Sequence, residues 1–221
     1  MEIDKQNNPL AKAYLKGIAV SAVALNRIGL GPTFYTVMGL ILAIFAGAAL
    51  WFGHLIIGGI LLFAGGLFDS MDGAIARLNG TATKFGALLD STFDRYSEFA
   101  IYLGFYGYLG HSYARFVDLF QIVAIFALLG SVMVSYVRAR SEALGISCSV
   151  GFWQRPERIV ALGTASIITG LLNPIMITFS YNYLHDIFIK LVLVVLAVGT
   201  NVTAIGRLAH GRQFLRERGL K

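Results

Sequence analysis

The sequence predicts an all-α integral membrane protein with six transmembrane helices, preceded by an N-terminal amphipathic helix in the membrane interface. Of its 221 residues, 57% are hydrophobic and only 14% are charged, and there are 16 phenylalanines. Soluble globular proteins carry roughly 25% charged residues, and a soluble chain of this size could not bury so much apolar surface. Because there is only one cysteine, Cys148, a disulfide scaffold is also excluded.

A transmembrane helix needs about 20 mostly apolar residues, and six segments meet this requirement. Short turn-like breaks that contain Gly, Asn or Pro separate several of them. Since six such helices take up most of the chain, we expect no second soluble domain. The predicted spans are residues 32–53, 55–76, 85–110, 117–139, 158–178 and 184–206.

The N-terminal region differs from the spans because it mixes charge with apolar residues. Lys12, Lys16 and Arg27 alternate with leucine, isoleucine and valine over residues 9–28, which is typical of a helix lying in the interface. A fully solvated helix is the alternative. The polar first residues do not resemble a signal peptide. We therefore divide the chain into an interfacial helix (1–30), a six-helix domain (31–208) and a basic cytoplasmic tail (209–221).

The distribution of lysine and arginine predicts the orientation in the membrane. If the N-terminus is cytoplasmic, all basic residues except Arg95, Arg115 and Lys190 fall on the cytoplasmic side. The positive-inside rule then places both termini in the cytoplasm of a multi-pass protein of the cell membrane. The net charge of +6 indicates contact with anionic lipids rather than with nucleic acid.

Carboxylates are concentrated where two predicted spans meet. Asp69 and Asp72 are three residues apart near the end of the second span, and Asp90 and Asp94 are four apart near the start of the third. Each pair shares one helix face, and the short turn between the spans makes them antiparallel neighbours. We expect all four to converge near the cytoplasmic face, and Glu98 to form a structural ion pair with Arg95.

Four converging carboxylates would repel one another without a cation. Oxygen-only ligands select a hard divalent ion, Mg²⁺ or Mn²⁺, and four aspartates could hold two ions about 4 Å apart, an arrangement suited to phosphoryl transfer. A small cation transporter is an alternative from another class. It would have acids distributed across the bilayer, whereas here they gather near one side.

The spacing of these acids resembles the signature of the CDP-alcohol phosphotransferases, D-x2-D-G-x2-A-R-x8-G-x3-D-x3-D. The resemblance implies a six-helical, usually homodimeric enzyme that transfers a phosphatidyl group from a CDP-linked lipid to an alcohol and releases CMP. Gly104, Gly107 and Gly110 could form part of a dimer interface or pack within one protomer. The matching positions are Asp69, Asp72, Gly73, Ala76, Arg77, Gly86, Asp90 and Asp94.

The resemblance also implies roles for individual residues. Asp69, Asp72 and Asp90 would bind the metal, while Asp94 would be both a metal ligand and the general base. The lipid would be CDP-diacylglycerol or, in an archaeal host, CDP-archaeol. The residues implied to bind the cytidine diphosphate part are Gly73, Arg77 and Thr83, with Thr33, Phe34, Tyr35 and Thr36 near its cytidine end.

Residues 135–145 and 155–158, with Gly206-Arg207-Leu208, resemble the phosphatidylinositol phosphate synthase branch, whose acceptor is inositol phosphate. Arg138, Arg155 and Arg207 end three spans on one side, and a cluster of guanidinium groups suits a phosphomonoester. These arginines could instead contact lipid headgroups. The branch often has lysine at the position of Arg138. Glycerol 3-phosphate is the alternative acceptor.

Overall fold

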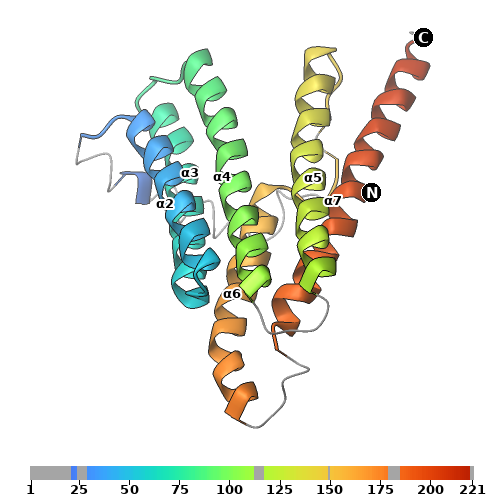
Figure 1. Ribbon diagram of the computed structural model, residues 1–221. Coiled ribbons are helices and arrows are strands. Elements are labelled where there is room, and N and C mark those ends of the chain that lie inside the picture. Colours follow the sequence, from blue (N-terminus) through green and yellow to red (C-terminus); the bar gives the residue numbers. More distant parts are fainter. Residues whose placement is uncertain (1–20, 24–28, 112–116, 149, 179–184, 220–221) are drawn as a thin grey trace.

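The computed structural model consists of helices throughout its described ranges, with no strand among them (Figure 1). The structure describes residues 21–23, 29–111, 117–148, 150–178 and 185–219. Residues 21–23 are helical, whereas most of the predicted interfacial helix (1–30) lies outside the described residues. The long helices are α2 (Pro32–Trp51), α3 (Leu55–Leu78), α4 (Lys84–His111), α5 (Val117–Ala143), α6 (Arg155–Thr178) and α7 (Ile187–Glu217).

Two helix boundaries differ from the prediction in ways that matter for the site. Helix α6 begins at Arg155 rather than at 158, with Pro156 in its first turn, where a proline needs no hydrogen-bond donor. Arg155 is therefore held by a helix and not by a loop. Helix α7 extends through most of the predicted tail to Glu217, because residues 209–217 contain no proline, and their one glycine, Gly211, is buried within the helix and does not end it.

Five of the described helices are long and apolar enough to cross a membrane: α2, α3, α5, the part of α6 from Arg155 to Met176, and α7. Helix α4 corresponds to the third predicted span and has a suitable length, but it carries four charged residues toward its N-terminal end: Asp90, Asp94, Arg95 and Glu98. That α4 crosses the membrane, giving six spans in all, therefore stays a prediction. Large apolar side chains on the outer faces of the other helices, such as Phe45, are exposed, as a lipid environment requires.

Helices α2, α3 and α4 lie side by side, α5 pairs with α7, and α6 contacts both α3 and α7 (Figure 1). Glycines allow the closest approaches. A Cβ atom on Gly47 of α2 would lie 2.3 Å from the carbonyl oxygen of Ala100, and one on Gly104 would lie 2.4 Å from that of Gly47. Gly107 likewise faces Trp51. These α4 glycines therefore pack within the chain, which is one of the two roles predicted for them.

Candidate metal and substrate site

Three aspartates from α3 and α4 form a compact cluster. Asp69, Asp72 and Asp90 each offer a carboxylate oxygen within 4.8 Å of the others. Asp69 and Asp72 lie near the end of α3, and Asp90 lies in the second turn of α4. A short turn containing Gly80, which has a positive φ of 63°, connects the two helices. The predicted convergence of these three acids is confirmed.

Asp72 is oriented by two donors. The hydroxyl of Thr36 on α2 donates to its Oδ2 at 2.6 Å, and the backbone N–H of Gly73 donates to its Oδ1. Both Thr36 and Asp72 are buried. A ligand whose orientation is set by a neighbouring donor is typical of metal sites. This contact gives Thr36, predicted near the cytidine, a position beside the acidic cluster.

The three aspartates fit a hard divalent cation. All three donors are carboxylate oxygens, which suit Mg²⁺ or Mn²⁺ and not a thiolate-preferring metal. Five carboxylates lie in this region, and three guanidinium groups of the described chain pair with members of the set, so two negative charges are left uncompensated. One divalent ion would balance that charge. The carboxylates are Asp69, Asp72, Asp90, Asp94 and Glu98; the guanidinium groups belong to Arg95, Arg155 and Arg158.

Asp94 lies beside this cluster and is not one of its three members. Its Oδ1 lies 2.6 Å from the NH1 group of Arg155, which also pairs with Asp69. Its Oδ2 lies 3.5 Å from Arg95. Arg155 thus bridges an acid of α3 and an acid of α4. Arg155 is one of the three arginines predicted to bind an acceptor phosphate, and its guanidinium lies directly at the acids.

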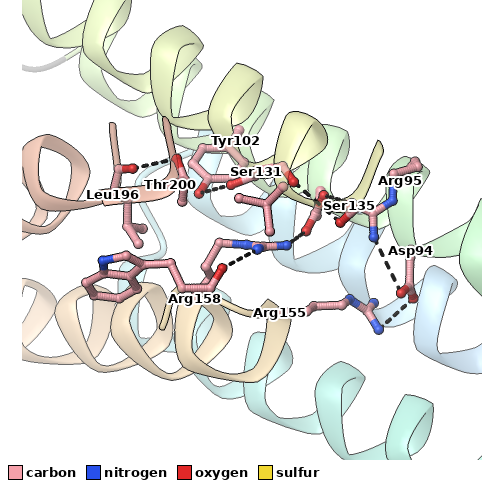
Figure 2. A network of polar contacts seen from close by, with 12 residues as sticks. Asp94, Arg95, Tyr102, Ser131, Ser135, Arg155, Arg158, Leu196 and Thr200 are labelled. Carbon is pink, nitrogen blue, oxygen red and sulfur yellow. Dashed lines mark hydrogen bonds and ion pairs between the residues drawn. The ribbon is translucent and has the colours of Figure 1, made fainter. Parts of the chain in front are cut away.

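The ion pairs continue from Asp94 along α4 and across to α6 (Figure 2). Arg95 lies 2.5 Å from Glu98, which confirms the predicted structural pair, and its NH1 group also donates to Ser135 of α5 at 2.8 Å. The other oxygen of Glu98 pairs with Arg158. Acids and arginines therefore alternate from Asp69 to Arg158 and connect α3, α4 and α6.

The other two arginines assigned to the acceptor lie apart from the acids. Arg138 is exposed on α5, where its Nε lies 2.8 Å from Glu142. Arg207 on α7 is only 2% exposed, and it donates to the carbonyl oxygens of Val134 at 2.5 Å and Val150 at 2.8 Å. Arg207 therefore connects α5, the loop before α6 and α7. In this structure, only Arg155 of the three contacts the acidic site.

The residues implied to bind the nucleotide surround the α3–α4 turn. A Cβ atom on Gly73 would lie 3.2 Å from the NH1 group of Arg77, so the guanidinium folds back over this glycine. Thr83 caps α4, because its Oγ1 accepts the N–H of Gly86 at 3.0 Å. Thr33 and Phe34 are exposed at the start of α2, whereas Tyr35 is buried against Met71 and Ile75.

An apolar pocket of about 680 Å³ opens beside the acids between α3 and the start of α6. Phe63, Leu67, Trp153 and Ile159 are among the apolar residues that line it, and Asp69 and Arg155 form part of its wall. The pocket thus has mostly apolar walls and is bordered on one side by the ionic cluster. No motif in the sequence marked it, because its walls come from segments about 90 positions apart.

The comparison with known proteins agrees with this geometry. Residues 30–203 match the family described as CDP-alcohol phosphatidyltransferase. The chain belongs to this family. The family resemblance predicted from the sequence is therefore confirmed. With several apolar helices and this family membership, the chain is a multi-pass membrane protein.

Named relatives of this CDP-alcohol phosphatidyltransferase include an archaetidylinositol phosphate synthase from Methanothermobacter thermautotrophicus. It is 38% identical over 169 residues, covering 76% of this chain and 80% of the relative. A phosphatidylinositol phosphate synthase from Mycobacteroides abscessus is 32% identical over 167 residues, covering 75% and 70%.

Two crystal structures of the Mycobacterium tuberculosis phosphatidylinositol phosphate synthase PgsA1 are similar to this fold. One has CDP-DAG bound and superposes with a TM-score of 0.73 at 29% identity, covering 88% of this chain and 92% of that one. The other is in complex with manganese and citrate, with a TM-score of 0.73 at 30% identity and 88% coverage of both chains.

Proposed function

We propose that this chain transfers a phosphatidyl or archaetidyl group from a CDP-linked lipid to a hydroxyl of inositol phosphate and releases CMP. The observation that carries the proposal is the junction at Asp69 and Arg155. There, an acidic cluster suited to a divalent cation meets an apolar pocket and a guanidinium group. A lipid pyrophosphate and an anionic acceptor need these three features together.

The apolar pocket would hold a hydrocarbon chain of the lipid substrate. Its volume of about 680 Å³ suits a long hydrocarbon chain, and its polar edge at Asp69 would bring the pyrophosphate to the acids. The relatives named for phosphatidyl and for archaetidyl products are consistent with either lipid.

Asp69, Asp72 and Asp90 would hold Mg²⁺ or Mn²⁺, with Asp94 as a further ligand and a second ion arriving with the pyrophosphate. The bound ion would supply positive charge at the pyrophosphate and so favour departure of CMP. The manganese-bound structure of a similar enzyme supports a divalent ion. Gly73, Arg77 and Thr83 would surround the cytidine diphosphate, with residues 33–36 near the cytidine.

Asp94 would act as the general base. In the proposed step, the acceptor hydroxyl oxygen forms a bond to the lipid-side phosphorus, the bond from that phosphorus to the CMP oxygen breaks, and the hydroxyl proton passes to Asp94. Arg155 lies 2.6 Å from Asp94. If Arg155 held the phosphate group of inositol phosphate, a hydroxyl of the inositol ring would therefore lie close to Asp94.

Arg138 and Arg207 would complete the acceptor site. Arg138 would leave Glu142, a surface partner that holds it weakly. Arginine has five N–H donors, so Arg207 could keep its two backbone contacts and still contact a phosphate. We also propose that α4 crosses the membrane, which brings the number of spans to six. Both termini and the site would face the cytoplasm, and the chain would form a homodimer.

The test is an acceptor panel with purified protein, CDP-diacylglycerol and Mg²⁺. We expect CMP release with inositol phosphate, and much less with glycerol 3-phosphate or with inositol, which lacks the phosphate that Arg155 would bind. Asp94→Asn should abolish release while the protein still folds and binds Mn²⁺. Release with glycerol 3-phosphate alone would contradict the proposed acceptor.

A further inference from the structure

Two ion pairs connect α4 to α6 one helical turn apart. Asp94 pairs with Arg155, and Glu98, four residues later on α4, pairs with Arg158, three residues later on α6. The deeper pair is almost fully buried, since Glu98 is 5% exposed and Arg158 is 3% exposed. Figure 2 shows Arg155 and Arg158 extending from α6 toward α4.

Both partners of the deeper pair have further contacts that fix their positions. One oxygen of Glu98 lies 2.5 Å from Arg95, which donates to Ser135 of α5. The NH1 group of Arg158 donates to the carbonyl oxygen of Trp153 at 2.9 Å. Trp153 stands two residues before Arg155, so this bond also fixes the backbone that enters α6.

Apolar packing is incomplete at this point between α4 and α6. A cavity of about 20 Å³, close to the volume that one water requires, lies there, and its lining includes Glu98, Tyr102, Arg155 and Arg158. The extensive packing of α4 is against α2 and α5, and that of α6 is against α3 and α7. The position of Arg155 relative to Asp94 therefore depends on the ion pair more than on close packing.

We propose that Glu98 and Arg158 are positioning residues that hold the Arg155 guanidinium at Asp94 and thereby set the affinity for the anionic acceptor. This inference rests on the proposed function. The metal cluster lies on α3 and α4, and Thr36 supports it from α2. Loss of the Glu98–Arg158 pair should thus affect the acceptor more than the metal.

Kinetics of single and double variants test the proposal. In Glu98→Gln, Arg158 keeps an uncompensated buried charge, so the KM for inositol phosphate should rise about tenfold, the scale expected when directly coupled residues are separated. The KM for CDP-diacylglycerol and the Mn²⁺ affinity should change less than the acceptor KM, because neither Glu98 nor Arg158 belongs to the three-aspartate cluster. Adding Arg158→Gln should not multiply the effect, and Arg158→Lys should retain part of the affinity.

Glu217→Gln is the matched control, because Glu217 is an exposed glutamate on α7 that accepts a hydrogen bond from Gln213. It should leave both KM values unchanged. An unchanged acceptor KM in Glu98→Gln would overturn the proposal. An equal loss of acceptor, lipid and Mn²⁺ binding would also overturn it, because it would show a general structural role.

A distance measurement separates this inference from the proposed function. Spin labels at Tyr96 on α4 and Leu171 on α6, both exposed, can be attached after replacing the buried Cys148 by serine. The distance distribution should be broader in Glu98→Gln than in the parent, and Arg158→Lys should be intermediate. If the parent releases no CMP with inositol phosphate, the proposed function fails, while an unchanged distribution would overturn the positioning role itself.

Discussion

Near the other end of α4, Tyr108, Asn173 and Asp186 form a second buried polar cluster, which differs from the acidic site in how its charge is compensated. Both Tyr108 and Asn173 donate to Oδ1 of Asp186. His185 Nδ1 lies 2.8 Å from Oδ2. The single carboxylate of this cluster is thus surrounded by donors from α4, α6 and the start of α7.

The acidic site has the opposite balance. Three of its aspartates share a space less than 5 Å wide, and the arginines that reach them leave a negative excess. An excess of like charge in a buried site is unfavourable unless a ligand neutralises it. The comparison indicates that the Asp186 cluster stabilises the fold. The acidic site instead destabilises the unliganded fold, because its charge is uncompensated, and that charge is suited to binding a cation.

The largest expected effect comes from Asp90→Asn, which removes one of the three carboxylates of the cluster. We expect Mn²⁺ binding to weaken sharply and CMP release to fall on the order of a thousandfold, since a bound metal supplies several kcal/mol of transition-state stabilisation. Electron paramagnetic resonance of Mn²⁺ and a CMP assay measure the two effects.

Asp118→Asn is the control, because Asp118 is an exposed carboxylate in the first turn of α5. It should retain wild-type metal binding and turnover. If Asp90→Asn also kept full turnover, the assignment of the three-aspartate cluster as the metal site would be wrong.

The second-largest effect is expected from Asp186→Ala, which should lower the free energy of unfolding without affecting metal binding. Asp186→Ala leaves the hydroxyl of Tyr108 and the amide of Asn173 without their shared acceptor, and it places alanine at a positive φ of 63°. We expect a loss of about 3 kcal/mol, which corresponds to a Tm lower by roughly 10 °C. Thermal unfolding in detergent measures the change.

The Mn²⁺ affinity and the turnover of the folded Asp186→Ala protein should stay within about twofold of wild type, because the two clusters lie at opposite ends of α4 and distant sites are independent. A selective loss of Mn²⁺ binding at unchanged Tm would contradict the contrast between the clusters.

The two regions also differ in how far sequence could predict them. The aspartates of the acidic site follow helical spacing on either side of a short turn, and Arg95 and Glu98 are three residues apart, so local geometry brings each pair together. The contacts of Asp186 with Tyr108 and Asn173 join three helices, and no spacing rule relates them. Sequence therefore predicted the first cluster and did not reveal the second.

Arg155 and Arg158 show the same limit within the site. Their charge and side of the membrane followed from the sequence, but their partners depend on the register of α6 against α4, which no periodicity specifies. Arg207 illustrates the converse: it was grouped with Arg155 because both end spans on one side. In the structure its buried guanidinium donates to two backbone carbonyl oxygens, contacts that its position in the sequence did not predict.

The smallest effect tests whether neighbouring donors tune the acidic site. Thr36→Val keeps the shape of the side chain but removes the hydroxyl that donates to Asp72 at 2.6 Å. A metal ligand that loses such a partner typically binds its metal 10–100-fold more weakly. Since Gly73 still donates to the other oxygen of Asp72, we expect the low end, about tenfold, with near-normal turnover at saturating Mn²⁺.

Thr92→Val is the matched control, because Thr92 is exposed on α4 and its hydroxyl donates to the backbone carbonyl oxygen of Leu88, away from the aspartates. A Mn²⁺ titration should show weaker binding in Thr36→Val and no change in Thr92→Val. Equal affinities in the two variants would mean that Asp72 is oriented without Thr36. The geometry of the acidic site would then be set by the helices and not by hydrogen bonds to its carboxylates.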